Sequence, residues 1–175
     1  MQDPRPTLLT AFFIFALLII AVYSAPTMGS DRDGARFCLA QNMYFEAGNQ
    51  SIAGKIAVSQ VVFNRVLNDN FPDSVCDVIY QAKLSKWHLA NGREVPLRNK
   101  CQFSWYCDGK PDVPVDSATW EESLRLAQTI LEAQASPYWT DFTEGALWYH
   151  ADYVYPYWAD SLNKTSVIDN HIFYK

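Results

Sequence analysis

The sequence has no run of lysines or arginines and only three histidines, and charged residues make up 19% of the chain. A protein that wraps nucleic acid needs a basic surface, whereas this chain has a formal net charge of −5. Nucleic acid is therefore not expected as a partner. Hydrophobic residues make up 49% of the chain, which excludes an intrinsically disordered protein.

Several catalytic motifs are absent as well. The chain contains no G-x-S-x-G elbow, no phosphate-binding P-loop and no H-E-x-x-H zinc motif. It has no C-x-x-C pair, and its histidines are scattered, so neither a metal nor a cofactor is predicted. Carboxylates are the residues left to carry chemistry.

One long apolar run lies near the N-terminus, from Leu8 to Val22, and Arg5 precedes it. The run is long for the core of a signal peptide and short for a full membrane span of about 20 residues. A cleaved signal peptide and an uncleaved signal-anchor in the membrane both remain open. Either one makes the protein exported, secreted or anchored on the periplasmic or extracytoplasmic side. We therefore divide the chain into the segment 1–29 and one domain, 30–175.

Export changes how the four cysteines are interpreted, because an oxidising compartment favours disulfides over free thiols. An even number of cysteines, Cys38, Cys76, Cys101 and Cys107, allows two disulfides in three pairings. A local Cys101–Cys107 bond would leave Cys38 for Cys76, but the sequence does not select this pairing. A Cys–His nucleophile is the weaker alternative.

The periodicity of apolar residues predicts a domain of the α+β class, mostly helical with a small β-sheet. The predicted helices cover about 33–47, 50–67, 74–82 and 117–135. The second of these is apolar nearly all round, from Ile52 to Leu67, which is typical of a helix central to the core. We predict a linker over 26–34, an irregular segment over 83–116, and short aromatic strands after Gly145.

Glu46 is the carboxylate with the most unusual setting. It lies at the predicted end of the first helix, between two aromatic residues and the break at Gly48-Asn49. An aromatic, partly dry setting raises the pKa of a carboxyl group, as a general acid at neutral pH requires. The alternative is a solvent-facing glutamate on an amphipathic helix.

A set of motifs begins around Glu46 and continues along the chain: Tyr44–Ala47, Gly54–Val58, Val61–Val66, Phe71-Pro72, Val75–Gln81, Cys101–Trp105, Gly145–His150 and Asn170–Tyr174. In this order they resemble the SleB/CwlJ-type cell wall hydrolase family, which includes spore cortex-lytic enzymes. The family often has glycine before the glutamate and Arg-Gly soon after it. This chain has Phe45 and Ala47-Gly48-Asn49 instead.

The resemblance implies a lysozyme-like or lytic transglycosylase-like fold and peptidoglycan as the partner. It implies cleavage of the glycan strand between N-acetylmuramic acid and N-acetylglucosamine, with Glu46 as acid and base of a lytic transglycosylase. A hydrolytic muramidase at the same bond is the first alternative, and Asp77 or Asp108 would then supply the second carboxylate. A non-catalytic wall-binding module is the second alternative. The oligomeric state is not predicted.

Other residues in the matching motifs are candidates for substrate binding, each with a structural role as its alternative. Hydrogen bonds to the sugar are expected from Gln102 and Ser104, and ring stacking from Trp105 and Tyr149. His150 and His171 lie in matching motifs too, although each is more often a structural residue that hydrogen-bonds within the fold. Asn64 and Arg65 are expected to be structural and to tie the central helix to the surroundings of Glu46.

Overall fold

The computed structural model describes residues 28–175. The apolar run Leu8–Val22, and with it the predicted signal peptide or signal-anchor, lies outside the described residues. Within 28–175, none of the helices has the length and apolar character that crossing a membrane demands. Residues 33–175 form one unit by their mutual contacts.

Helix α2, Met28–Ala47, carries Glu46 in its last turn, as predicted. Gly48 follows at once. A Cβ at that position would lie 2.5 Å from the carbonyl oxygen of Tyr44, so only glycine fits this exit from the helix. The tight exit is one reason why Glu46 lies at the end of a rigid element.

The start of α2 differs from the prediction. The helix already includes 28–34, which we had assigned to a linker because of its polar, turn-like composition. Gly34 lies inside the helix, and a Cβ there would meet no neighbouring atom. A glycine at an open helical position costs only about 1 kcal/mol relative to alanine, so it does not have to end the helix.

Helix α3, Ile52–Val66, is the central helix of the fold, as its composition predicted. Its N-cap is Ser51, whose hydroxyl accepts a hydrogen bond from a backbone N–H in the first turn. Three of its valines have no exposed surface: Val58, Val61 and Val62. The prediction of an apolar, buried helix from Ile52 to Leu67 is wrong at both ends, where Ile52 is 58% and Leu67 77% exposed.

The C-terminal strands form one antiparallel sheet in the order β3-β5-β4. Their bounds are Trp148–Ala151 for β3, Lys164–Ile168 for β4 and His171–Tyr174 for β5. The 3-10 helix η2, Ala159–Ser161, precedes β4. Tyr149 pairs with Phe173 across the first two strands. The predicted aromatic strands are therefore confirmed at 148–151 and 171–174, whereas the tyrosine-rich stretch 153–158, also predicted to be a strand, consists of turns and irregular structure.

The middle of the chain is more ordered than predicted. Helix α4, Val75–Ile79, is shorter than the predicted 74–82, and the segment predicted to be irregular contains a second small sheet. Its elements are β1, Ala82–Leu84; α5, Lys86–Ala90; β2, Pro96–Cys101; and the 3-10 helix η1, Ser104–Cys107. Four of the six residues of β2 are exposed, so the strand lacks the alternation of apolar and polar residues that marks a half-buried strand.

Two disulfides join these elements, in one of the three pairings that the sequence left open. Cys38 of α2 is bonded to Cys76 of α4, and Cys101 of β2 is bonded to Cys107 of η1. The first bond ties α4 to the buried side of α2. The second closes the turn that carries η1.

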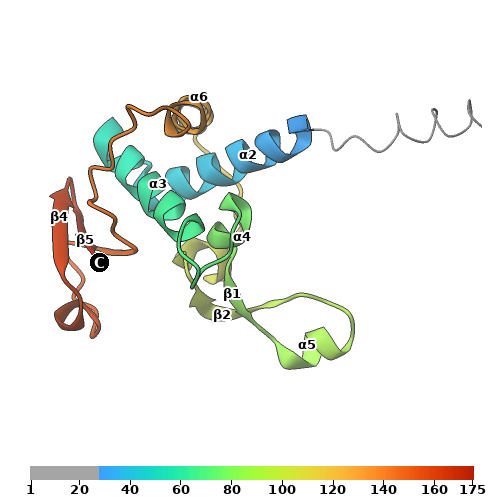
Figure 1. Ribbon diagram of the computed structural model, residues 1–175. Helices are drawn as coiled ribbons and strands as arrows, with labels where there is room; N and C mark the ends of the chain where they lie inside the picture. The colour runs from blue at the N-terminus through green and yellow to red at the C-terminus, as the bar shows by residue number, and fades with distance from the viewer. Residues whose placement is uncertain (1–27) are drawn as a thin grey trace, which may run out of the picture. The chain divides into compact units, whose positions relative to one another are not determined.

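Helix α6, Ser117–Gln134, completes the core. The largest buried cluster joins residues of α2, α3, α4, η1 and α6. Figure 1 shows α2 and α3 meeting at an angle, with the three-stranded sheet on one side of α3 and β1–β2 beyond α4. The predicted class, mostly helical with small sheets, is confirmed.

Candidate active site

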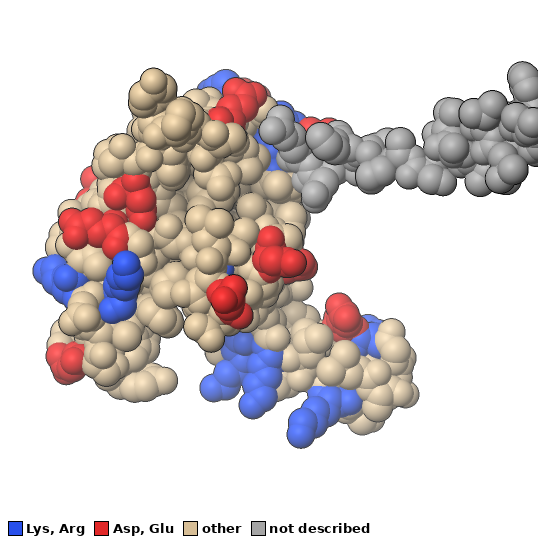
Figure 2. Space-filling model, viewed as in Figure 1, with Lys and Arg blue, Asp and Glu red and all other residues tan. Residues whose placement is uncertain are grey.

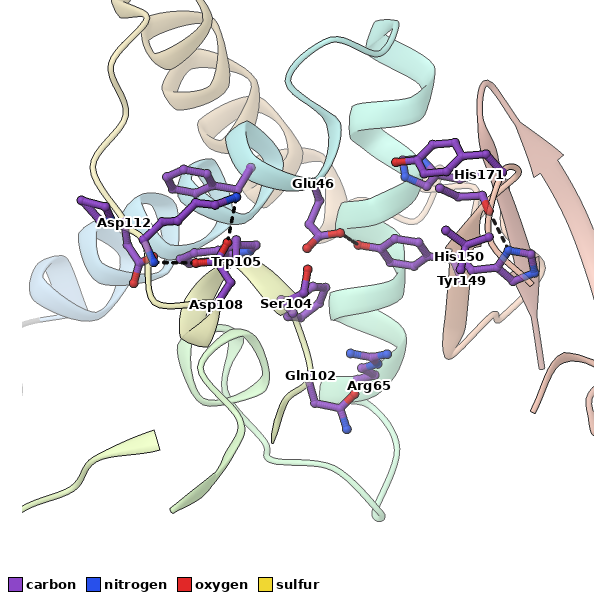
Figure 3. A pocket seen from close by; sticks show the side chains of 17 residues that line it. Glu46, Arg65, Gln102, Ser104, Trp105, Asp108, Asp112, Tyr149, His150 and His171 are labelled. Atoms are coloured by element: carbon purple, nitrogen blue, oxygen red, sulfur yellow. Dashed lines mark hydrogen bonds and ion pairs between the residues drawn. The ribbon is translucent and has the colours of Figure 1, made fainter. Parts of the chain in front are cut away.

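A cleft of about 560 Å³ opens beside the C-terminal end of α2. One side is formed by the segment 102–112, which contains η1, and the other by β3 and the loop that follows it. Of the predicted site residues, the cleft brings together Glu46, Gln102, Ser104, Trp105, Tyr149, His150 and His171. In Figure 3 Glu46 lies between the η1 side and the Tyr149 side.

The carboxyl group of Glu46 has a pKa raised above its ordinary value, and burial is the main cause. Two neighbours act in the opposite direction. The Tyr149 hydroxyl donates a hydrogen bond to Glu46 Oε2 at 3.0 Å, and the positive charge of Arg65 favours the carboxylate. The effect of burial on the pKa is larger than the effects of these two neighbours, so at neutral pH the carboxyl group is closer to protonation than that of an exposed glutamate. Such a carboxyl can give and then take back a proton.

Tyr149 reaches Glu46 from a strand 103 residues away in sequence. Burial, followed by the neighbouring Glu46 carboxylate, raises the pKa of its phenol, so the hydroxyl stays protonated and acts as a donor. Its ring lies edge-on to His171, with ring centroids 5.1 Å apart. Tyr149 is therefore a polar contact of the acid as well as an aromatic wall of the cleft.

We expect Tyr149→Phe to raise the pKa of Glu46 further, because the hydroxyl that stabilises the carboxylate is removed. An NMR titration of the Glu46 side-chain carboxyl would measure the change. Tyr174→Phe is the matched control, since the Tyr174 hydroxyl contacts His150 and not Glu46. An unchanged or lowered pKa in Tyr149→Phe would contradict this expectation.

Arg65 plays a larger part than the tie between elements that we predicted. Its guanidinium carbon lies 5.3 Å from the ring centroid of Phe71 and 5.2 Å from that of Phe103. Nε donates to the carbonyl oxygen of Leu147 at 2.8 Å, whereas buried Nη1 has no hydrogen-bond partner within 28–175. Arg65 thus lines the cleft with a fixed positive charge near Glu46.

Asn64 connects the central helix to the segment that leads into β3. Its Nδ2 donates to Asp141 Oδ2 at 2.9 Å, to the Ala146 carbonyl at 3.1 Å and to Thr143 Oγ1 at 3.2 Å. With the bond from Arg65 to Leu147, these contacts fix the chain just before Tyr149. This agrees with the structural role expected of Asn64.

The η1 side of the cleft is built on stacked aromatic rings. Trp105 stacks on Phe45 with ring centroids 4.9 Å apart, and its Nε1 donates to Asn42 Oδ1 at 3.1 Å. Phe45, which stands where the family often has glycine, therefore supports this wall. Gln102 and Ser104 are exposed beside it, and both line the cleft.

The two histidines differ in how many of their ring nitrogens form hydrogen bonds. His150 uses both ring nitrogens: Nδ1 donates to the Ala151 carbonyl at 2.8 Å, so Nε2 accepts from the Tyr174 hydroxyl at 2.9 Å. This supports a structural role. His171 is buried, which lowers its pKa, and its Nδ1 has no partner in the part of the chain described. His171 is the better candidate for contact with a substrate.

The two carboxylates proposed as partners of Glu46 lie in different places. Asp77 is exposed in the first turn of α4, where Ser74 is the N-cap: Asp77 Oδ2 accepts from Ser74 Oγ at 2.6 Å, and the Asp77 N–H donates to the same hydroxyl. It does not line the cleft. Asp108 does, and hydrogen bonding from the Lys110 backbone lowers its pKa, so it is ionised at neutral pH.

Sequence reasoning missed several further residues of the cleft, three of which stand out. Asp112 lines it, and partial burial followed by the charge of Asp108 raises its pKa. Tyr153 and Val154 line it from the loop after β3, and Tyr153 is 84% exposed. The signal available was a cluster of tyrosines in a turn-rich stretch, which we had assigned to strands.

Within 28–175, no group of three histidine, cysteine or carboxylate side chains is placed to bind a metal.

These features describe an acid at the bottom of an aromatic-walled cleft on a mostly helical α+β domain. The family model of the Cell Wall Hydrolase family matches residues 49–174, and the chain belongs to this family. The resemblance found in the sequence motifs is thereby confirmed. The matched range begins three residues after Glu46.

Two solved structures share the fold. One is the catalytic domain of the SleB protein from Bacillus cereus, with a TM-score of 0.50, 22% identity, and 82% of this chain and 91% of that chain covered. The other is the catalytic domain of a germination-specific lytic transglycosylase, SleB, from Bacillus anthracis, with a TM-score of 0.51, 23% identity, and coverage of 86% and 100%. No curated protein matches the chain.

Proposed function

We propose that this protein cleaves the glycan strand of peptidoglycan between N-acetylmuramic acid and N-acetylglucosamine, as a lytic transglycosylase with Glu46 as its acid and base. The observation that carries the proposal is the setting of Glu46. It is a carboxyl group with a raised pKa, hydrogen-bonded to Tyr149, in a cleft of a cell wall hydrolase. The name of the Bacillus anthracis structure supports the same class of reaction.

The reaction needs one carboxyl group used twice. Protonated Glu46 donates its proton to the glycosidic oxygen while the bond from that oxygen to C1 of the muramic residue breaks. The electron pair goes to the leaving oxygen, and C1 becomes oxocarbenium-like. The Glu46 carboxylate then takes the proton of the 6-hydroxyl of the same residue as O6 bonds to C1. The products are a 1,6-anhydromuramic end and a free 4-hydroxyl on N-acetylglucosamine.

The neighbours of Glu46 match these two states. Tyr149 donates a hydrogen bond that favours the carboxylate formed after proton transfer, and the charge of Arg65 acts in the same direction. Trp105 and Tyr149 present aromatic surface to the apolar faces of sugar rings. Ser104 and Gln102, both exposed, supply polar contacts for the N-acetyl and hydroxyl groups, and the ring of His171 lines the same cleft.

Hydrolysis at the same bond is the second candidate, and one observation favours it. Asp108, held ionised by Lys110, lines the same cleft as Glu46. A glycosidase that adds water uses a second carboxylate of this kind as base or nucleophile. Asp112 lines the same cleft, and partial burial raises its pKa, so its carboxylate holds a proton more strongly than that of Asp108.

Mass spectrometry of the muropeptides released from purified peptidoglycan by the full-length protein separates these reactions. We expect anhydromuramic ends, because the 6-hydroxyl attacks C1 in place of water. Reducing muramic ends would move the assignment to hydrolysis. Cut peptides on intact glycan would reject both and indicate a peptide-cleaving enzyme. No release at all would leave the wall-binding module.

A further inference from the structure

The segment β1–α5–β2, residues 82–101, has a charge opposite to that of the whole protein. It carries five cationic side chains and one carboxylate, Glu94, whereas the chain has a net charge of −5. The five cations are Lys83, Lys86, Arg93, Arg98 and Lys100. Figure 2 shows lysine and arginine side chains gathered over this segment, with few elsewhere on the same face.

A groove of about 530 Å³ runs along the base of this segment. It is lined by 81–83 on one side and 99–102 on the other, so Lys83 and Lys100 both line it. Both lysines are exposed, and within 28–175 neither forms an ion pair with a carboxylate. Two exposed lysines that line one groove without a carboxylate partner favour an anionic ligand.

The groove adjoins the candidate active site. Gln102 lines both the groove and the cleft that holds Glu46, so a long ligand bound in the cleft passes close to the groove. Their charges differ. The cleft contains both signs, with Arg65 and Lys110 beside the carboxyl groups of Glu46, Asp108 and Asp112, whereas the groove contains two lysines and no carboxylate. An anionic group that reaches the groove therefore meets only positive charge there.

Peptidoglycan carries such a group at every second sugar. Each muramic residue bears a stem peptide with free carboxylates, joined through the lactyl ether at its 3-position. A glycan strand lying in the cleft must place these peptides beside it. We infer that the groove lined by Lys83 and Lys100 is a subsite for the carboxylates of the stem peptide, an inference that rests on the proposed function.

A second anionic surface, an acidic phospholipid membrane, fits the same charges less well. Exposed Trp87 on α5, together with the lysines, has the composition of a membrane-interface contact. Such a contact requires no link to the cleft, however, and the groove shares Gln102 with it. The peptide subsite explains that adjacency and the membrane does not.

The test compares two double variants of the full-length protein on two substrates. Lys83→Ala/Lys100→Ala removes the charges of the groove. Lys86→Ala/Arg93→Ala is the matched control, because it removes equal charge from the same segment at residues that do not line the groove. The substrates are glycan strands with their stem peptides and strands from which an amidase has removed them. The readout is kcat/KM for strand cleavage.

We expect the groove variant to lose about 3- to 30-fold in kcat/KM on peptide-bearing strands, the range that two exposed ion pairs supply. It should equal the wild type on peptide-free strands, and added salt should reduce the difference. The control variant should match the wild type on both substrates. Equal losses on both substrates, equal losses in both variants, or no loss would each overturn the inference.

A binding measurement separates this inference from the proposed function. If the wild type cleaves neither substrate, the proposed reaction fails, and a peptide-bearing muropeptide is then titrated into the protein and followed by amide NMR. Shifts at 81–83 and 99–102 that the groove variant abolishes would support the subsite without catalysis, and their absence would overturn it. A third outcome is that the wild type sediments with anionic phospholipid vesicles, that both double variants lose this binding, and that cleavage does not differ between the two substrates. That outcome would assign the charges to a membrane and overturn the subsite.

Discussion

Glu46→Gln is expected to reduce strand cleavage by about 10²- to 10⁴-fold, the contribution typical of a general acid and base. The amide keeps the size of the side chain and the aromatic surroundings but cannot give up a proton to the glycosidic oxygen. The release of muropeptides from purified peptidoglycan, followed over time by mass spectrometry, measures the loss. Activity equal to that of the wild type would reject Glu46 as the acid.

The same variant also tests whether the loss is chemical or structural. Burial raises the pKa of Glu46 in the folded protein, so the folded state binds the proton more tightly than the unfolded state. Ionisation of the buried Glu46 therefore lowers the free energy of unfolding. This loss of stability is absent below the pKa of the unfolded state, and it grows as the pH rises through the raised pKa of the folded state. Glu46→Gln should therefore unfold no more easily than the wild type at neutral pH, as measured in urea. Clear destabilisation would point to a structural role.

Asp108→Asn is the matched control for the choice of mechanism. It removes a carboxylate from the same cleft without touching the pair of Glu46 and Tyr149. A transglycosylase with one catalytic carboxyl group should keep most of its activity in this variant. A loss comparable to that of Glu46→Gln, together with reducing ends among the products, would favour hydrolysis with two carboxylates.

Removal of the Cys38–Cys76 disulfide is expected to cost about 4 kcal/mol in free energy of unfolding, the value that loop closure gives for a separation of 38 residues. Cys38→Ala/Cys76→Ala tests it, with urea unfolding as the measurement. The bond joins α2, which carries Glu46, to α4, and Cys38 lies in the main core cluster. Removal of this bond therefore costs a large share of the free energy of unfolding of a small domain.

Cys101→Ala/Cys107→Ala is the natural comparison. This bond closes only six residues, and the same relation gives about 2 kcal/mol. It brackets η1, however, which carries Ser104 and Trp105 at the cleft. The second variant should thus be the more stable of the two and still lose activity. A larger loss of stability for the short loop would contradict the loop-closure argument.

The sequence predicted the elements whose signals are local. Glu46 was placed at a helix end by its own neighbours, and Gly48 fills a position where a Cβ would meet the Tyr44 carbonyl. Helix α3 was recognised as central because its valines cover several faces. The order of motifs identified the family, whose model then matched 49–174. Each of these rests on residues close together in the chain.

The second sheet was missed for a physical reason. Strand β2 is mostly exposed and rich in polar residues, so it carries no apolar alternation, and its pairing with β1 is irregular. The groove with Lys83 and Lys100 exists only because these two strands pair. A list of charges along the chain did not reveal it.

By itself, then, the sequence predicted Glu46 as the candidate acid and determined the long helices, the class of fold and the family, because residue type and short-range spacing encode them. The tertiary structure alone decided what surrounds the acid. It brought Tyr149 to Glu46 across 103 residues, set Arg65 between two aromatic rings, selected the disulfide pairing and separated Asp77 from the cleft while keeping Asp108 in it. These contacts join distant segments through packing of the whole core, and the pKa of Glu46 depends on burial that only the folded chain provides.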